Sequence, residues 1–319
     1  MDILLTGSVA YDYLMTFPGL FKEQILPERL ENISLSFLVD SMSRQRGGVA
    51  PNIAYTMALL GERPRVMATV GEDFEEYRAW LEEKGVDTTL MKVVPGVYTA
   101  SFFATTDQVN AQIASFYPGA MGFAAQQSLT EVRPSPDLVI VSPNAPEAMT
   151  KFAAECRQLN FPYLYDPSQQ VLRLTGDELA RDMECAHFLF VNDYEFGLVS
   201  NKTGLDLTQM LKHIDVLVIT RGAEGSSVYA NGSEINVPVV PPERIVDPTG
   251  VGDAFRGGFL AGYTHGWNWE LCGQVGALAA TFCLEQKGPQ NHTYTSAEFV
   301  ARFRKHFDDR GRLDTLFQS

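Results

Sequence analysis

Short apolar runs alternate with helical patterns along most of the chain. Strand-like runs occupy residues 3–10, 65–70, 138–141, 163–166, 188–192 and 216–220. Helical patterns lie between them, for example 51–60 before Gly61 and 74–83 before Gly85. This alternation predicts an α/β fold with a mostly parallel sheet that helices cover on both faces.

The last third of the chain adds a hairpin and further helices to this pattern. Asn231-Gly232 separates two short strand-like runs within 226–237, which is a strong hairpin signal. A small and apolar run at 254–263 predicts a helix, and a second helix is expected to follow it. Residues 296–307 are typical of an amphipathic C-terminal helix.

Two stretches interrupt the α/β pattern. Residues 13–47 are irregular and strand-rich, and residues 95–119 contain β-like runs at 99–106 and 112–116. We expect these stretches to form a small β lid over a ligand cleft; the alternative is an edge hairpin without a gating role. The expected division is a large α/β catalytic domain at 1–12, 48–94 and 120–319, and the lid at 13–47 and 95–119.

Composition and charge limit the class of protein. The chain has 319 residues, of which 45% are hydrophobic, enough for a substantial core. Its net charge of −14 argues against a nucleic acid or an anionic membrane surface as partner. The N-terminus lacks a signal-peptide pattern, and the four cysteines lack C-x-x-C spacing. We therefore expect a cytoplasmic protein with reduced thiols in its core.

The most informative segment is the glycine loop Asp247-Pro-Thr-Gly-Val-Gly-Asp253, which precedes a predicted helix. Unpaired N–H groups at a helix start, together with the helix dipole, form an anion site. A carboxylate beside such a site is expected to deprotonate the group that attacks a phosphate. The loop therefore predicts a phosphoryl-transfer centre; the alternative is a glycine-rich turn in which Asp253 is an ordinary first-turn acid.

Other glycine-loop motifs do not fit this segment. The dinucleotide pattern requires glycine where the chain has Phe255, and the Walker pattern requires a Gly-Lys pair, which the sequence lacks. A dehydrogenase is therefore the weakest hypothesis. Polar residues also follow several predicted strands, namely Ser8, Asp12, 166–170, 192–195 and 220–222. Ligands bind beyond the carboxyl ends of parallel strands, so one shared cleft is expected.

Several motifs resemble the signatures of the ribokinase-like (PfkB) carbohydrate and nucleoside kinases. Gly47-Gly-Val-Ala-Pro-Asn52 is similar to their first signature, and residues 247–259 to their second, with Pro248 in place of the commoner threonine. Asn192-Asp-Tyr-Glu195 resembles their N-x-x-E element, and Thr220-Arg-Gly222 with Gly225 resembles their nucleotide loop. Within the family, segments 6–12, 35–40, 111–121 and 166–170 resemble the bacterial, mycobacterial-type adenosine kinases.

The resemblance implies a ribokinase-like fold with a small β-sheet lid. It also implies transfer of the ATP γ-phosphate to the 5′-hydroxyl of adenosine, which gives AMP and ADP. Asp253 would be the general base, and the amides of Gly250, Val251, Gly252 and Asp253 would form the anion hole.

The same resemblance implies a nucleoside site. Its expected members are Ser8, Asp12, Gly48, Asn52, Phe102, Phe116, Gln169, Gln170 and Arg173. Asp12 would accept hydrogen bonds from the ribose 2′- and 3′-hydroxyls. The rings of Phe102 and Phe116 would stack on the purine, with packing inside the lid as the alternative. Arg173 would face the phosphates of ATP.

The implied cofactors are ATP and Mg²⁺. Asn192 and Glu195 would hold Mg²⁺ largely through water, and the ATP site would be lined by Asn192, Thr220, Gly222 and Gly225. Many family members also bind a monovalent cation such as K⁺, for which Asp247 occupies the matching position. Homodimers occur in the family, so the resemblance also allows a homodimer.

Two other functions stay open. A sugar kinase of the same family, acting on ribose or a fructose phosphate, is less favoured because two aromatic faces suit a base better than a sugar. A non-catalytic nucleotide-binding module is disfavoured by Asp253. The sequence leaves open the choice among adenosine, inosine and guanosine.

Overall fold

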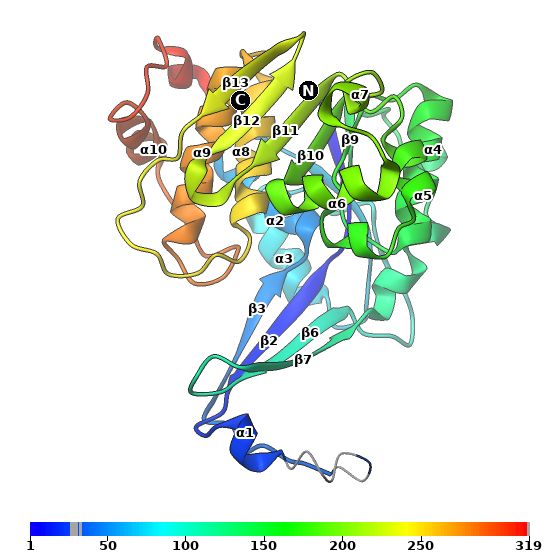
Figure 1. The fold of residues 1–319 in the computed structure, drawn as a ribbon, viewed down its shortest axis with the longest axis vertical. Helices are drawn as coiled ribbons and strands as arrows, with labels where there is room; N and C mark the ends of the chain where they lie inside the picture. Colours follow the sequence, from blue (N-terminus) through cyan, green and yellow to red (C-terminus); the bar gives the residue numbers. More distant parts are fainter. Residues whose placement is uncertain (26–30, 32–33, 318–319) are drawn as a thin grey trace.

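The computed structural model describes residues 1–25, 31 and 34–317. It contains a nine-stranded sheet and a separate four-stranded sheet (Figure 1). The large sheet is built from β1 (Ile3–Thr6), β4 (Arg65–Val70), β5 (Met91–Val93), β8 (Leu138–Val141), β9 (Tyr163–Tyr165), β10 (Phe188–Asn192), β11 (Val216–Thr220), β12 (Ser226–Ala230) and β13 (Ser233–Val237). The small sheet is built from β2 (Ala10–Thr16), β3 (Ser41–Gly47), β6 (Ala100–Thr106) and β7 (Gln112–Tyr117).

The large sheet is mostly parallel, as the alternation of elements predicts. Its strand order is β13-β12-β11-β10-β9-β8-β1-β4-β5. Only β12 and β13 run antiparallel to their neighbours within the described sheet. Asn231 and Gly232 connect these two strands with φ angles of 52° and 74°. Both values are positive, as a two-residue hairpin turn requires, so the predicted hairpin is confirmed.

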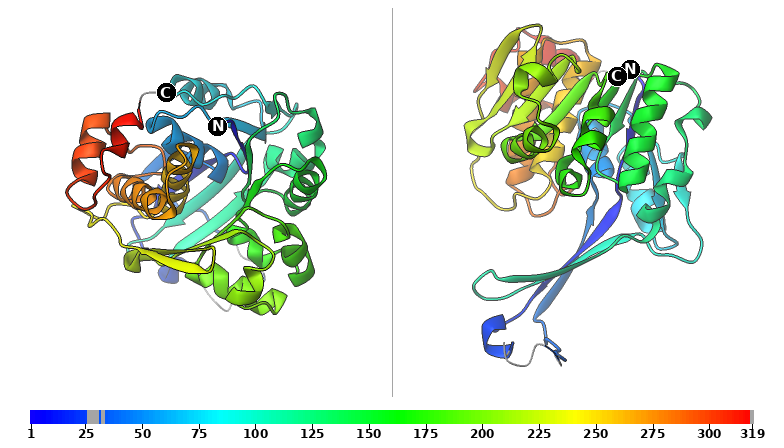
Figure 2. Two further views of the ribbon diagram at one scale, coloured as in Figure 1. Left: turned by 90° about the horizontal axis from the view of Figure 1, so that it is seen from above. Right: turned by 45° about the vertical axis from the view of Figure 1, so that its right-hand side comes forward.

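Helices cover both faces of the large sheet (Figure 2). The α-helices are α1 (Phe21–Gln24), α2 (Val49–Leu59), α3 (Glu75–Glu83), α4 (Pro146–Leu159), α5 (Gly176–Met183), α6 (Asp193–Thr203), α7 (Leu207–Met210), α8 (Val251–Thr264), α9 (Trp269–Leu284) and α10 (Ser296–Phe303). Side chains of a strand alternate between the faces: Leu5 joins the core under α2, α8 and α9, whereas Leu4 joins the core under α4. Two apolar cores therefore enclose one sheet, which explains why its strands read as unbroken apolar runs.

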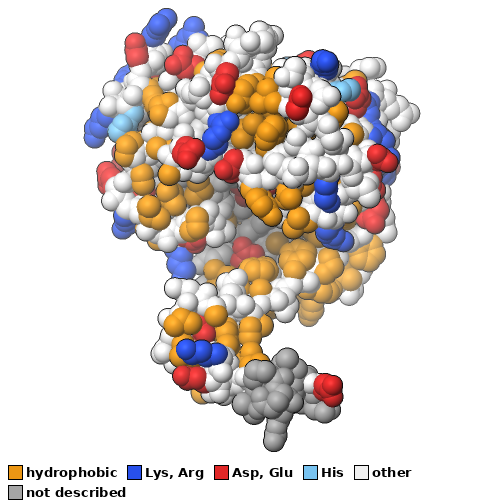
Figure 3. Space-filling model, viewed as in Figure 1, with side chains coloured by type: hydrophobic (Ala, Val, Ile, Leu, Met, Phe, Trp, Pro, Cys, Tyr) orange, Lys and Arg blue, Asp and Glu red, His pale blue; other side chains and the backbone are white. Residues whose placement is uncertain are grey.

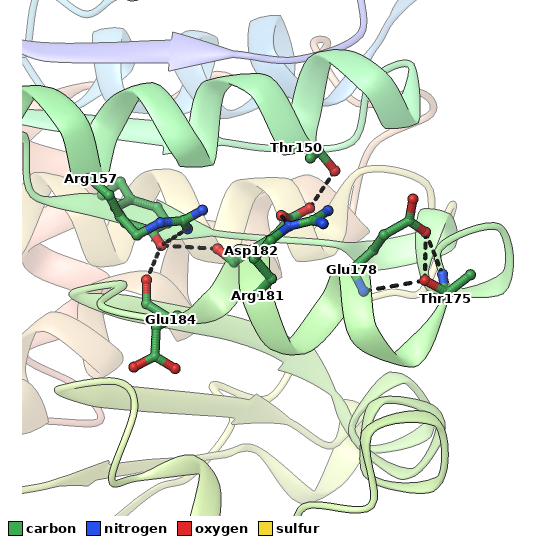
Figure 4. A network of polar contacts seen from close by, with 8 residues as sticks. Thr150, Arg157, Thr175, Glu178, Arg181, Asp182 and Glu184 are labelled. Atoms are coloured by element: carbon green, nitrogen blue, oxygen red, sulfur yellow. Dashed lines mark hydrogen bonds and ion pairs between the residues drawn. The ribbon is translucent and has the colours of Figure 1, made fainter.

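Polar contacts hold α4 against α5 on one face of the sheet (Figure 4). Thr150 on α4 donates a hydrogen bond of 2.5 Å to the fully buried carboxylate of Asp182 on α5. The Tyr163 hydroxyl lies 3.0 Å from the carbonyl oxygen of Asp182 and 2.6 Å from that of Glu184. These contacts satisfy buried polar groups that would otherwise destabilise the fold.

The small sheet extends from the end of the body where many strands of the large sheet finish (Figures 1 and 2). Its order is β3-β2-β6-β7, so the two insertions expected to form a lid do pair with each other. The expected boundary after residue 12 falls inside β2, which begins at Ala10. Residues 26–30 and 32–33 of the expected lid segment lie outside the described part of the chain.

Three sequence expectations were wrong in detail. The run 3–10 is not one strand: β1 ends at Thr6 and Ala10 already belongs to the small sheet. The break falls at Gly7, where an added Cβ would lie 2.1 Å from the Ser142 hydroxyl oxygen. The C-terminal helix ends at Phe303 rather than 307. Cys185 is exposed in a turn, whereas the other three cysteines are buried as expected.

Among the described residues, no helix combines the length and the apolar character that a membrane crossing requires.

Candidate active site

The glycine loop forms the start of α8. Gly250 is the N-cap residue and adopts a left-handed conformation with φ 78°. An added Cβ there would lie 2.3 Å from the Cβ atom of Pro289, so both the backbone angle and the space require glycine. The N–H groups of Gly250, Gly252 and Asp253 have no backbone partner in the described structure, and that of Val251 makes only a long 3.4 Å contact with Pro248. These amides are available to an anion.

Asp253 stands in the first turn of α8 and is partly exposed. Its Oδ2 atom accepts a hydrogen bond of 2.8 Å from the Nδ2 atom of Asn52 on α2. Burial raises the pKa of Asp253 to about 6, although Arg256 and the Asn52 amide both act to lower it. A carboxyl group with this pKa is ionised at neutral pH yet is more basic than an exposed aspartate, which suits a general base.

Arg256 lies one turn after Asp253 and forms a buried ion pair that sequence reasoning missed. Its Nε atom is 2.6 Å from Oδ2 of Asp166, and its Nη2 atom donates to Oδ1 at 2.8 Å. The Asp166 side chain is 0% exposed and that of Arg256 is 8% exposed. The pair fastens the end of β9 to α8. The only signal in the sequence is the spacing of three residues between Asp253 and an arginine in an otherwise small and apolar helix.

A cavity of about 650 Å³ opens on one side of the α8 start. Its lining includes the residues predicted for the nucleotide, namely Asn192, Thr220, Gly222 and Gly225, together with Val251 and Gly252. Its walls are largely apolar, with Val240, Phe255 and Leu284 among the lining residues. The loop amides therefore border a space of the size and polarity that ligand sites typically have.

The small sheet presents three of the predicted substrate residues on one face. Asp12 is the register partner of Phe102, and Phe102 is the register partner of Phe116. Directly paired residues project from the same face, so the carboxylate and the two rings lie in a row. Phe116 is 50% exposed, which disfavours packing within the lid core as its role. Burial, and then the charge of Asp247, raise the pKa of Asp12 to about 6.

Ser8 and Gly48 meet where the body joins the small sheet. The Ser8 hydroxyl accepts a hydrogen bond of 3.2 Å from the N–H of Val49, the first residue of α2. Gly48 has φ 96°, and an added Cβ would lie 2.5 Å from the Ser8 carbonyl oxygen. Only glycine fits this junction without strain. The contact sets the start of α2, which carries Asn52.

Gln169, Gln170 and Arg173 lie on or just after the short helix η4 (Ser168–Leu172). Gln170 is 7% exposed, and its buried Oε1 atom has no partner in the described structure. Gln169 and Arg173 are exposed, and no hydrogen bond among the described residues joins either side chain to the α8 start. Their roles stay a prediction.

Asn192 and Glu195 form a capping box at the start of α6. The Glu195 N–H donates to Asn192 Oδ1 at 2.7 Å, and the Asn192 N–H donates to Glu195 Oε2 at 2.8 Å. The other Glu195 oxygen has no donor among the described residues. Within the described chain no group of three or more His, Cys, Asp or Glu side chains is placed to hold a metal. The amide oxygen of Asn192 and the carboxylate of Glu195 are oxygen donors of the kind that would hold Mg²⁺ together with water and ligand phosphates, and this role stays a prediction.

Asp247 holds the glycine loop in place through hydrogen bonds with main-chain N–H groups. Its two oxygens accept hydrogen bonds from the N–H groups of Thr249 and Gly288, both at 2.9 Å. Burial opposes ionisation, but these donors and the charge of Lys287 hold the pKa of Asp247 below its ordinary value. The group is an ionised carboxylate next to the anion site. A role in binding a monovalent cation stays a prediction.

The molecular face between the body and the small sheet is hollowed (Figure 3). This arrangement places the partly exposed Asp253 carboxylate, which can accept a proton, next to free main-chain amides, which can bind an anion. One side of the amides faces the apolar cavity, and Asn52 connects the carboxylate to the lid junction.

Known proteins resemble this chain over most of its length. The model of the pfkB family of carbohydrate kinases matches residues 6–296. The structure of Burkholderia thailandensis nucleoside kinase in complex with inosine is 38% identical, with TM-score 0.85, over 96% of this chain and 98% of that chain. The nucleoside kinase of Methanocaldococcus jannaschii is 29% identical over 95% of this chain and 97% of that protein. The adenosine kinase of Saccharomyces cerevisiae is 28% identical over only 46% of this chain and 47% of that protein.

Proposed function

The chain belongs to the pfkB family of carbohydrate kinases and has its ribokinase-like fold, and we propose that it is an ATP-dependent nucleoside kinase. In this proposal it transfers the γ-phosphoryl group of ATP to the 5′-hydroxyl of a purine ribonucleoside. The observation that carries the proposal is the Asp253 carboxylate, which stands in the first turn of α8 beside free amides that border an apolar cavity.

The residues of the chain can perform each step of this transfer. Asp253 removes the proton of the 5′-hydroxyl while that oxygen forms a bond to the γ-phosphorus. The bond between the γ-phosphorus and the bridging oxygen breaks, and ADP leaves. Negative charge on the transferred group is met by the amides of Gly250, Gly252 and Asp253, which are fixed in place before the reaction.

The lid supplies the nucleoside side of the proposal. The Asp12 carboxylate suits a vicinal diol because each of its oxygens can accept a hydrogen bond from one hydroxyl group. Phe102 and Phe116 offer aromatic faces for a base, whereas a sugar kinase would need polar groups there. The register of the small sheet therefore supports a nucleoside over a free sugar.

Adenosine is the nucleoside that the sequence motifs favour. Inosine is a second candidate because the Burkholderia nucleoside kinase, similar over almost its whole length, has a structure in complex with inosine. The yeast adenosine kinase matches less than half of this chain. We infer that the pocket accepts a purine 6-position carrying either an amino group or a carbonyl oxygen.

The cofactor proposals follow from the same site. Mg²⁺ would be held by Asn192 and Glu195 through water and by the phosphates of ATP, and it would neutralise phosphate charge. K⁺ beside Asp247 and a homodimer are further proposals that rest on the resemblance, and a cytoplasmic location is one that rests on the cysteine pattern.

A nucleoside and sugar panel with ATP and Mg²⁺, followed by ADP release, tests the function. We expect turnover with adenosine and inosine, and none with ribose or fructose phosphate. The variant Asp253→Asn should retain ATP binding and lose roughly a hundredfold or more in kcat. Turnover of ribose alone would make the chain a sugar kinase, and unchanged activity of Asp253→Asn would remove Asp253 as the base.

A further inference from the structure

A buried chain of hydrogen bonds leads from Asp253 to the junction between body and lid. Gln290, between α9 and α10, is 2% exposed and donates through Nε2 to Asn52 Oδ1 at 2.8 Å. The same Nε2 group donates to the Tyr77 hydroxyl. That hydroxyl donates to the Gly47 carbonyl oxygen at 3.0 Å, and Asn52 Nδ2 donates to Asp253 at 2.8 Å.

The two ends of this chain fix the direction of every bond in it. An ionised carboxylate and a main-chain carbonyl can only accept hydrogen bonds. Asn52 must therefore turn its NH₂ group towards Asp253 and its oxygen towards Gln290. Tyr77 has one proton, which it gives to Gly47, so its oxygen must accept from Gln290. The centre of the chain thus requires a group that donates twice, and the Gln290 NH₂ group does so.

We propose that Gln290 is a positioning residue: it orients the Asn52 amide towards Asp253 and, through Tyr77, joins the base to the lid junction at Gly47 and Gly48. The proposal rests on the proposed phosphoryl transfer, because Asp253 is the base of that reaction. Gly47 is the last residue of β3 and Gly48 caps α2. A shift of this lid strand therefore moves the Gly47 carbonyl, which is the last group in the series of hydrogen bonds.

Asp253 also interacts with charged and titratable groups that do not belong to this series of hydrogen bonds. Arg256 on α8 itself favours its ionised form, whereas Glu195 on α6 disfavours it. Asp166 after β9 and Cys283 on α9 are within electrostatic reach. None of these groups orients the Asn52 amide, so a change at residue 290 acts on Asp253 separately from them.

Two variants of Gln290 separate positioning from space filling. Gln290→Glu keeps the shape but replaces the double donor with an acceptor, so Asn52 must turn its NH₂ group away from Asp253. Gln290→Met keeps the approximate volume and removes the donor without adding charge. We expect kcat to fall on the order of tenfold to a hundredfold for Gln290→Glu and less for Gln290→Met. If Gln290 only fills space, the isosteric Gln290→Glu will be the milder change, and the proposal is overturned.

A titration tests the proposal without relying on kinase activity. Carbon-13 NMR of carboxyl-labelled aspartate follows Asp253, whose signal is identified by its loss in Asp253→Asn. We expect a midpoint near pH 6 in the unchanged protein and a midpoint roughly one unit higher in Gln290→Glu. An unchanged midpoint in a folded Gln290→Glu protein overturns the proposal. If the unchanged protein phosphorylates no nucleoside, the proposed function fails while the titration still decides the role of Gln290 in orienting Asn52.

The route through Asn52 is tested by combining variants. If Gln290 acts through Asn52, adding Gln290→Met to Asn52→Ala will move the Asp253 midpoint no further. If Gln290→Met instead shifts the Asp253 midpoint in Asn52→Ala by as much as it does when Asn52 is intact, Gln290 acts by another route. Tyr77→Phe is the matched change at the lid end: it breaks the link to Gly47 and leaves the Asn52 bond, so KM for the nucleoside should rise more than kcat falls.

Discussion

The buried ion pair between Arg256 and Asp166 allows a stability prediction whose size follows from the structure. The two side chains form two contacts of 2.6 and 2.8 Å and are almost completely buried. Two opposite unit charges about 4 Å apart attract each other by about 4 kcal/mol at an effective dielectric constant near 20. Burial raises the pKa of Asp166 to about 7 although Arg256 lowers it, and removing Arg256 leaves this buried carboxyl without its partner, which typically costs about 3–5 kcal/mol.

We therefore expect Arg256→Met to lower the free energy of unfolding by about 3–5 kcal/mol at pH 7. The matched control is the double variant Arg256→Met with Asp166→Leu, which removes both charges and should recover most of the loss. Urea unfolding followed by circular dichroism measures both values. A loss below about 1 kcal/mol for Arg256→Met, or a double variant less stable than the single one, would refute the reasoning, because the pair would then behave like an exposed one.

Four further predictions concern the site itself. Burial raises the pKa of Asp253 from its ordinary 3.8 to about 6, so the ionised group destabilises the fold above pH 6. The free energy of unfolding should therefore rise as the pH falls from 6 to 4, which urea titrations at these two pH values measure. For the same reason Asp253→Asn should be more stable than the unchanged protein in urea titrations at pH 7, above that pKa. In the same pH range kcat/KM should fall as Asp253 is protonated, and a flat profile between pH 5 and 7, values bracketing that pKa, would contradict its role as base. Gly48→Ala places a Cβ 2.5 Å from a carbonyl oxygen at φ 96°, so we expect a loss of about 2 kcal/mol or more by thermal unfolding, whereas Gly85→Ala, a control with positive φ but open space, should lose less. Phe116→Leu should raise KM for adenosine on the order of tenfold in steady-state kinetics and leave KM for ATP unchanged; equal changes in both would argue against stacking on the base.

The strands of the large sheet could be predicted because burial on both faces gives each a short apolar run. The runs at 65–70, 138–141, 188–192 and 216–220 coincide with β4, β8, β10 and β11. The same signal failed at the first strand, since apolar residues resume at Val9 and Ala10 after Thr6-Gly-Ser8 while the chain passes from one sheet into the other. Hydropathy records burial and not the sheet that provides it, so this break could not be read from the pattern.

The local part of the candidate site was predictable for a similar reason. The start of α8 lies within seven consecutive residues, and one of its glycines, Gly250, is required by a backbone angle that a motif can reveal. Arg256 and Gln290 were missed because their partners are distant in the sequence: Gln290 meets Asn52 across 238 positions and Arg256 meets Asp166 across 90. No periodicity or spacing rule links such pairs, and each residue alone reads as an ordinary polar side chain.

The charges around the α8 start also explain why a cation should accompany the nucleotide. Asp253 lies within electrostatic reach of Glu195 and Asp166, and Arg256 is the positive group that acts on all three carboxylates. Arg256 is already paired with Asp166, so little of its charge is left to attract phosphate. The free amides supply partial charges, which suit a single transferred group better than a whole triphosphate. We expect a site this acidic to favour ATP whose charge a divalent ion has reduced, and Asn192 of the capping box, which lines the cavity, would help to hold that ion. We therefore expect the acidic surroundings of Asp253 to make the proposed Mg²⁺ a requirement for binding and not only for chemistry.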